Sequence, residues 1–272
     1  MKIANYHTHT TYCDGKNTAE EMIIAAIEND MSEIGFSVHS PLPFYANWAI
    51  REERLSEYKS ELKALKEKYK DQITVYIGIE QDYFSEIPTD GFDYVIGSVH
   101  YIYKNGEYLA LDLSADEVKS NITKHYNGDA LAYCEDYYDL VTDVYNKTKC
   151  DIIGHFDLIT KFNEKMPLID TNAERYKKAV KKALDALLDC PAIFEINTGA
   201  ISRGYRTCPY PQEEILDQIA DSGKPFVVNS DSHSVESIAF GIVDQMRVLS
   251  VCGYRYTRSL DEILERSRIK SI

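Results

Sequence analysis

The sequence has no uninterrupted apolar stretch approaching the roughly 18 residues that a membrane-spanning helix needs. The first residues, MKIANYHTHT, enter a strand-like pattern at once, so we expect no secretory leader. The six cysteines are scattered and include no CxxC pair. We therefore expect free thiols in a cytoplasmic protein that has no membrane partner.

Positive charge is also scarce. The sequence has 30 Lys and Arg and 44 Asp and Glu, which gives a formal net charge of −14 and a pI near 5.0. No basic track is evident, and such a field repels nucleic-acid phosphates unless bound cations reverse it locally. We expect a small-molecule partner and no nucleic acid. Nothing in the sequence favours a particular oligomeric state.

The chain shows no internal repeat, low-complexity segment or Pro/Gly-rich linker, so its 272 residues are expected to form a single domain. Short apolar runs alternate with helical periodicity, the pattern of βα units around a parallel sheet. This predicts an α/β fold, with seven strands near residues 3–7, 33–38, 73–80, 94–99, 151–154, 192–197 and 225–229. The long gap over about 101–149 is expected to be an insertion with two helices.

Two helix starts carry the sequence pattern of a capping box. Thr18 with Glu21 precedes one helical run, and Thr171 with Glu174 precedes another.

The histidines have a common position on this strand map: six of the seven lie at or just beyond the carboxyl end of a predicted strand, where Glu80 and Asp231 also lie. In a parallel α/β barrel these ends open on one face, which is where active sites are built. His7 and His9 also obey the strand period of two, so both rings face one side and can hold one ion. These residues are His7, His9, His39, Glu80, His100, His155, Asp231 and His233.

Taken singly, each of these histidines could equally be a hydrogen-bonded residue at a loop mouth. Their joint placement makes that interpretation improbable. Glu80 closes the apolar run ITVYIGI, where a buried carboxylate is costly unless a cation accompanies it. The pattern therefore predicts a metal site at one end of the barrel.

The motifs around these residues resemble the polymerase-and-histidinol-phosphatase (PHP) superfamily, and within it the monofunctional histidinol-phosphate phosphatases. They extend from residue 7 to residue 233, and together they are specific, whereas HxH alone would be weak. They are HTHTTYCDG, GFSVHSP, GIEQDY, GSVHY, GHFDLI, FEINTGA and NSDSH.

The resemblance implies a distorted (β/α)7 TIM-like barrel over residues 1–272 and a centre of three divalent ions, zinc, iron or manganese. Its first ion would be held by His7, His9, Glu80 and Asp231. The second would share Glu80 and add His100 and His155, and the third would use Asp14, His39 and His233. Glu80, Asp231 and His233 would be the catalytic residues.

Three such ions against three carboxylate ligands leave about +3 in the pocket, which would attract a phosphomonoester although the whole protein is acidic. A hydroxide bridging two ions is the implied nucleophile. The expected reaction is hydrolysis of L-histidinol phosphate to L-histidinol and phosphate, a step of histidine biosynthesis. Two alternatives are a PHP-type phosphoesterase acting on nucleotides or other small phosphomonoesters, and a non-catalytic metal-binding regulatory module.

Substrate contacts are expected from cations on loops at the same face. Arg203 is the first candidate, because a guanidinium matches phosphate geometry, followed by Lys161 and Arg206. Each could instead be an ordinary surface cation. Glu195 could support the metal ligands or bind the substrate's ammonium group. The aromatic residues of PLPFYANWA could form a wall for an imidazole or only pack their loop.

Overall fold

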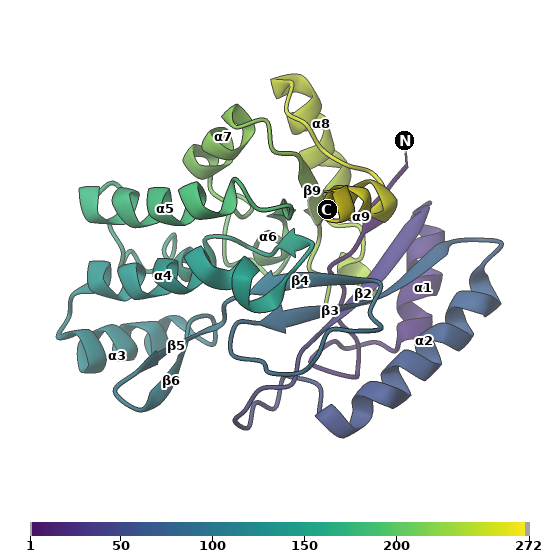
Figure 1. The fold of residues 1–272 in the computed structure, drawn as a ribbon, viewed down its shortest axis with the longest axis horizontal. Helices are drawn as coiled ribbons and strands as arrows, with labels where there is room; N and C mark the ends of the chain where they lie inside the picture. The colour runs from purple at the N-terminus through teal and green to yellow at the C-terminus, as the bar shows by residue number, and fades with distance from the viewer. Residues whose placement is uncertain (1, 270–272) are drawn as a thin grey trace.

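A computed structural model describes residues 2–269 of the protein and the side chains of residues 2–266. Seven strands, all paired in parallel, form one sheet in the order β1-β2-β3-β4-β7-β8-β9 (Figure 1). Their bounds are Ala4–Asn5, Glu33–His39, Thr74–Asp82, Tyr94–Ser98, Ile152–Ile153, Ile193–Asn197 and Phe226–Asn229.

The sheet curls into a nearly closed barrel, because its first and last strands meet just beyond their ends. Thr8 and Ser232 form a parallel bridge, in which Ser232 N donates to His7 O at 3.0 Å and His9 N donates to Ser232 O at 2.8 Å. The Asn229 side chain accepts a hydrogen bond from Tyr6 N at 2.8 Å. The closing contacts thus lie among the residues predicted to form the site. The predicted seven-stranded TIM-like barrel is confirmed.

Most strands are followed by helices on the outside of the barrel (Figure 1). These are α1 (Ala19–Glu28), α2 (Leu55–Tyr69), α5 (Glu174–Leu187), α7 (Glu213–Asp221), α8 (Ile242–Cys252) and α9 (Leu260–Ile269). The described link from β3 to β4, residues 83–93, contains no helix, so the βα alternation is interrupted there. Within residues 2–269 no helix is both long and apolar enough to cross a membrane.

Of the two predicted capping boxes, one forms. Thr18 accepts a hydrogen bond from Glu21 N, and the Glu21 carboxylate accepts one from Thr18 N. The predicted capping box at Thr171 is wrong. The Asp170 side chain accepts a hydrogen bond from Asn172 N, and the Asp170 carbonyl accepts one from Ala173 N. Residues 170–173 therefore form a turn, and α5 begins only at Glu174.

Residues 101–149 form a hairpin followed by two helices. The hairpin pairs β5 (Tyr101–Lys104) with β6 (Glu107–Ala110), and its turn residues Asn105 and Gly106 both have positive φ, as a tight hairpin turn requires. The helices are α3 (Ala115–Tyr126) and α4 (Ala130–Thr148), and α4 packs beside α5 (Figure 1).

The barrel interior is filled from one end by aromatic and aliphatic side chains. The buried Tyr94 ring lies across Gly35 of β2 and Gly78 of β3, where a Cβ would come within 2.4 Å of its atoms. Its hydroxyl donates to the backbone carbonyl of Tyr6. Glycine is therefore required at both positions, and this packing leaves the opposite end of the barrel for polar side chains.

Candidate metal centre

All nine predicted metal ligands gather at the carboxyl end of the barrel. His7 and His9 follow β1, His39 ends β2, and His100, His155, Asp231 and His233 follow later strands, while Asp14 comes from the loop before α1. Glu80 differs slightly from expectation, because β3 continues two residues further, to Asp82. The nine form four overlapping groups whose ligand atoms lie within 4.8 Å of one another: His9, Asp14, His39 and His233; His7, Glu80 and His155; His7, His9 and Asp231; and His39, Glu80 and His100.

The first part of the centre, formed by His7, His9, Glu80 and Asp231, is buried. Nε2 of His7 lies 3.2 Å from Glu80 Oε2 and 3.7 Å from Asp231 Oδ1. Nε2 of His9 lies 3.6 Å and 3.3 Å from the same two oxygens. Four atoms that bind one ion at about 2.1 Å in a tetrahedral arrangement lie about 3.4 Å apart. The four side chains therefore have the spacing of a metal site.

Glu80 extends this site with its second oxygen. Nε2 of His155 lies 2.9 Å from Glu80 Oε1, and Nε2 of His100 lies 3.3 Å from it. Ser98 donates to the same oxygen at 2.7 Å. One carboxylate thus faces histidines on both of its oxygens, as a carboxylate that bridges two ions would.

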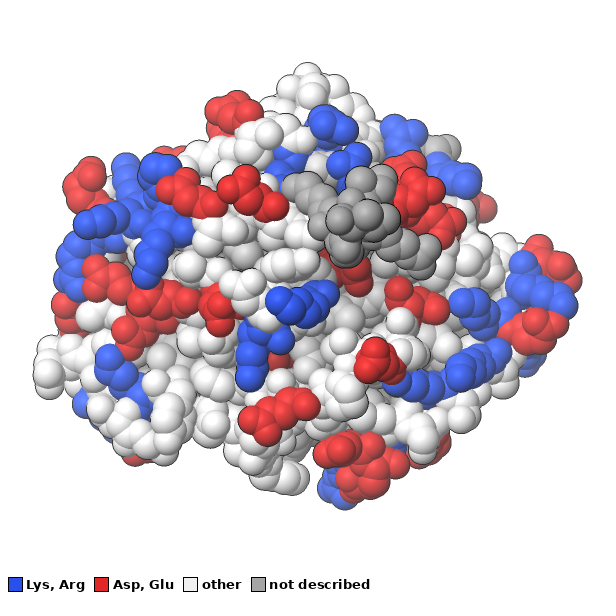
Figure 2. Space-filling view, in the orientation of Figure 1, with Lys and Arg blue, Asp and Glu red and all other residues white. Residues whose placement is uncertain are grey.

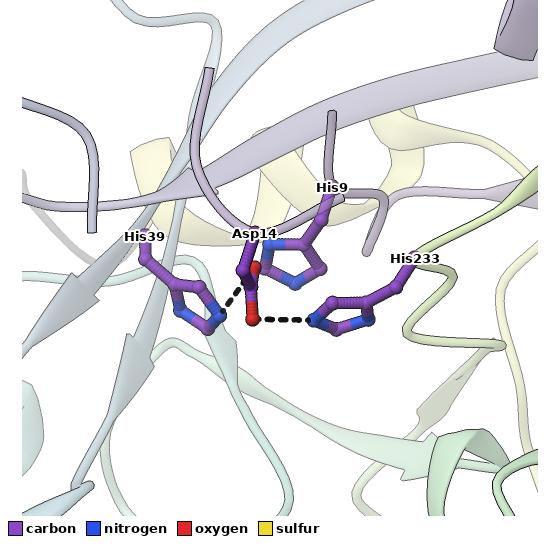
Figure 3. Close-up of side chains that lie close together, drawn as sticks. All are labelled: His9, Asp14, His39 and His233. Carbon is purple, nitrogen blue, oxygen red and sulfur yellow. Dashed lines mark ion pairs between the residues drawn. The ribbon is translucent and has the colours of Figure 1, made fainter. Parts of the chain in front are cut away.

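Asp14 lies between two histidines at the mouth of the site (Figure 3). Its Oδ1 lies 3.5 Å from His39 Nε2, and its Oδ2 lies 3.4 Å from His233 Nε2. Behind it, the His9 ring stacks on both of these rings. The tight turn that presents Asp14 depends on Gly15, where a Cβ would come within 2.5 Å of the backbone of Thr10 and His9.

Buried partners fix the histidine rings from behind. Glu195 Oε1 lies 2.6 Å from His7 Nδ1, and Asp82 Oδ2 lies 3.0 Å from His100 Nδ1. The Glu195 carboxylate also accepts from His155 N, Asn197 and Asn229. Such partners orient an imidazole and leave its other nitrogen free to bind a metal.

The electrostatics of the chain alone keep its carboxylates ionised. Burial would raise the pKa of Glu80, but His7 and the neighbouring imidazoles hold it well below its ordinary value. Burial likewise raises the pKa of Asp231, but Arg203, His7 and the neighbouring histidines together hold it well below its ordinary value. Burial, together with two neighbouring histidines, lowers the pKa of His9, so its ring stays neutral and can donate a lone pair.

Several polar atoms in this group have no hydrogen-bond partner within the described residues. They are Nε2 of His7, Nε2 of His9, Nδ1 of His39 and Oε2 of Glu80. Buried polar atoms without partners are costly, and these converge on one another instead of pointing into apolar packing. Imidazole nitrogens and carboxylate oxygens suit divalent ions such as zinc, manganese or iron. The residues present therefore fit divalent metal ions.

The centre opens into a cavity of about 390 Å³. Arg203 lines it, with its side chain 30% exposed, and donates to Asp231 Oδ2 at 2.9 Å and Asp231 O at 2.8 Å. Lys161 also lines it and donates to the Asp112 carboxylate at 3.2 Å. Two of the three predicted phosphate-binding cations thus reach the cavity.

Arg206 and Glu195 do not line this cavity. Arg206 is buried, donates to Thr160 at 2.7 Å and lies 3.5 Å from the Asp157 carboxylate, so its charge is already neutralised inside the protein. Glu195 lies behind His7, with both oxygens occupied by protein donors. Of its two predicted roles, this geometry fits support of a metal ligand.

The aromatic residues of the segment PLPFYANWA, residues 41–49, have two different roles: two form part of the cavity wall and one packs the loop. Tyr45 and Trp48 line the cavity, and the Trp48 ring lies edge-on to His39 with 4.6 Å between centroids. Phe44 instead stacks on Tyr108 of the hairpin at 4.0 Å.

Sequence reasoning missed Asp82, Asn197 and Asn229 as supporting residues and Asp112 as a cavity residue. Asp82 could have been found, since it lies two residues after Glu80 and shares its face of the strand. Asp112 carries no such signal, because it follows a hairpin whose packing is not evident from sequence.

A parallel barrel with imidazoles and carboxylates clustered at its carboxyl end defines an α/β barrel metalloprotein. The chain belongs to the PHP domain family, whose sequence model matches residues 5–199. It is 28% identical to a protein named "Probable histidinol-phosphatase" from Deinococcus radiodurans, over 93% of this chain and 95% of that one.

Two crystal structures share the fold. One, described as a candidate histidinol phosphatase of Listeria monocytogenes, superposes with a TM-score of 0.77 at 23% identity, over 89% of this chain and 99% of that one. The other is a histidinol phosphate phosphatase of Lactococcus lactis described as complexed with zinc, L-histidinol and phosphate. It has a TM-score of 0.71 at 20% identity, and covers 94% of this chain and 95% of that one.

Proposed function

We propose that this protein is a metal-dependent phosphomonoesterase that hydrolyses L-histidinol phosphate to L-histidinol and phosphate. The observation that carries the proposal is the convergence of six histidines and three acids on one buried end of the barrel, beside a cavity that contains Arg203 and Lys161. Membership of the PHP domain family supports it. Relatives named as histidinol phosphatases also support it, because this chain matches them over nearly their whole length.

We further propose three divalent ions in this centre. His7, His9, Glu80 and Asp231 would hold the first, and Glu80 with His100 and His155 the second. Asp14, His39 and His233 would hold the third, at the mouth of the cavity. The ions would supply Lewis acids and, at neutral pH, an activated water.

The chain's own residues would position the ester. Arg203 presents its guanidinium beside Asp231 and His233, where a phosphate at the cavity floor would accept from it. Glu80, Asp231 and His233 would lie nearest the reacting phosphorus. Because Arg203 also neutralises Asp231, it would both bind phosphate and hold a metal ligand in place.

We propose one domain over residues 1–272, with residues 101–149 inserted between two barrel strands. A cytoplasmic location fits its six free cysteines. On the face in Figure 2, both charge signs lie side by side over α4 and α5, where Arg175 pairs with Glu135 and Lys182 with Asp139. That mixture supports a small-molecule substrate, since it offers no basic surface to nucleic acid.

The test measures metal content per chain and phosphate release in the same preparation. L-histidinol phosphate is compared with nucleoside monophosphates and p-nitrophenyl phosphate, and it is expected to have the largest kcat/KM. A larger kcat/KM for a nucleotide would contradict the proposed substrate. A folded, metal-loaded protein that releases phosphate from none of these esters would contradict the proposed enzymatic activity.

A further inference from the structure

Three carboxylates line the cavity: Asp14, Asp112 and Asp231. The first and third belong to the candidate metal groups, whereas Asp112 belongs to none of them within the described residues. Asp112 follows strand β6, and the preceding residue Leu111 donates its N–H to the carbonyl of His100 at 3.0 Å. The backbone thus holds an acid that is not needed for metal binding directly beside the centre.

The Asp112 side chain is held in place yet remains accessible from the cavity. Lys161 donates from Nζ to Asp112 Oδ2 at 3.2 Å and to its backbone oxygen at 2.9 Å, and the side chain is 32% exposed. Burial raises the pKa of Asp112, but Lys161 and the nearby imidazoles of His100 and His155 together lower it below its ordinary value. A carboxylate accepts about four hydrogen bonds, so one to Lys161 leaves capacity for another cation.

We propose that Asp112 binds the ammonium group of the substrate and selects phosphomonoesters that carry an amine close to the ester. This rests on the proposed function, in which the ester has an ammonium group two carbons from its bridging oxygen. Such a substrate needs a positive environment for its phosphate and a negative one for its amine. Arg203 and the metal centre provide the first, and Asp112 provides the second.

Lys161 then has a role different from phosphate binding. Its ammonium is directed at Asp112, which it holds in one orientation. Because charged hydrogen bonds are about twice as strong as neutral ones, a fixed carboxylate in a partly buried cavity discriminates strongly between an ammonium group and a hydrogen atom.

A purely structural role for Asp112 makes a different prediction. If the pair with Lys161 only fastened the hairpin to the barrel, its loss would affect all substrates alike. The distinguishing measurement is therefore the ratio of kcat/KM for two esters that differ only in the amine. L-histidinol phosphate and 3-(imidazol-4-yl)propyl phosphate form such a pair.

The experiment compares the metal-loaded wild type, Asp112→Asn and Asp116→Asn. Asp116 is an exposed acid four residues away and serves as the matched control. Asp112→Asn is expected to lose about 10- to 100-fold in kcat/KM on the amine ester and less than about threefold on the desamino ester. Activity on the desamino ester shows that the variant is folded, and Asp116→Asn should match the wild type on both.

Equal losses on both esters, or an unchanged preference for the amine in Asp112→Asn, would overturn the role of Asp112 and leave the proposed function intact. The same experiment also detects failure of the proposed substrate. If the wild type cleaves neither imidazole ester, the proposed substrate is wrong. The role of Asp112 would then still be supported by an Asp112-dependent preference for phosphoethanolamine over ethyl phosphate, and overturned if that preference is absent.

Discussion

Nδ1 of His7 lies 2.6 Å from Oε1 of Glu195, although the two residues are 188 positions apart in the chain. The contact spans the barrel from β1 to β8 and turns Nε2 of His7 toward Glu80. Glu195 also accepts from the backbone of His155, a second histidine of the centre. One buried carboxylate therefore orients two parts of the metal site without reaching the cavity.

Glu195→Gln is expected to weaken metal binding more than substrate binding. The amide NH2 would face the donors that now bind Glu195, so His7 would lose its fixed orientation. A loss of about 10- to 100-fold in metal affinity is expected. Metal content after dialysis at a fixed free-metal concentration measures this, with Glu214→Gln on the surface of α7 as the control. Unchanged metal content with a raised KM would instead favour Glu195 as a substrate residue.

Glu80→Gln and Arg203→Ala should differ in their kinetic effects. Glu80 faces histidines on both oxygens, so its replacement should deplete two ion sites and lower kcat by about 100-fold or more. Arg203→Ala should mainly raise KM, by about 10- to 100-fold. Steady-state kinetics on phosphomonoesters at one fixed free-metal concentration compare the two. Arg203→Lys separates charge from geometry, and similar kinetic profiles for Glu80→Gln and Arg203→Ala would contradict these roles.

Arg206→Met should reduce stability. The Arg206 and Asp157 side chains are almost completely buried, so removing the cation leaves a buried carboxylate uncompensated, at a cost of about 3–5 kcal/mol. Urea unfolding measures the loss. Arg175→Met breaks exposed ion pairs, which solvent screens, and should cost much less stability than Arg206→Met. If Arg206→Met instead leaves the free energy of unfolding unchanged and raises KM, Arg206 contacts substrate as the sequence suggested.

Metal removal should lower the melting temperature. Without ions, Nε2 of His7, Nε2 of His9 and Oε2 of Glu80 are buried and have no hydrogen-bond partner in the described part of the chain. Each ion present at 100 times its Kd should contribute about 2.7 kcal/mol to the stability of the folded chain. Thermal unfolding is compared before and after chelation and after addition of zinc or manganese. Identical melting temperatures in the three samples would argue against ions in this centre.

Much of the fold and of the centre could be predicted from local pattern. Apolar runs defined the strands, and strand ends defined where side chains would meet, because parallel strands end on one face of a barrel. The prediction was weaker where a residue has competing partners. Thr171 lacks its capping box because Asp170 forms a turn with the residues that follow.

The primary structure by itself determined the α/β class with a parallel sheet and the kinds of residue at the carboxyl ends of its strands, since strand period and the alternation of strands with helices need only local information. The tertiary structure alone decided which cations remain available. Arg206 turns inward to Asp157, Lys161 turns to Asp112, and Arg203 reaches the cavity beside Asp231. Long charged side chains reach many partners, and the one they bind depends on neighbours brought close only by the folded chain.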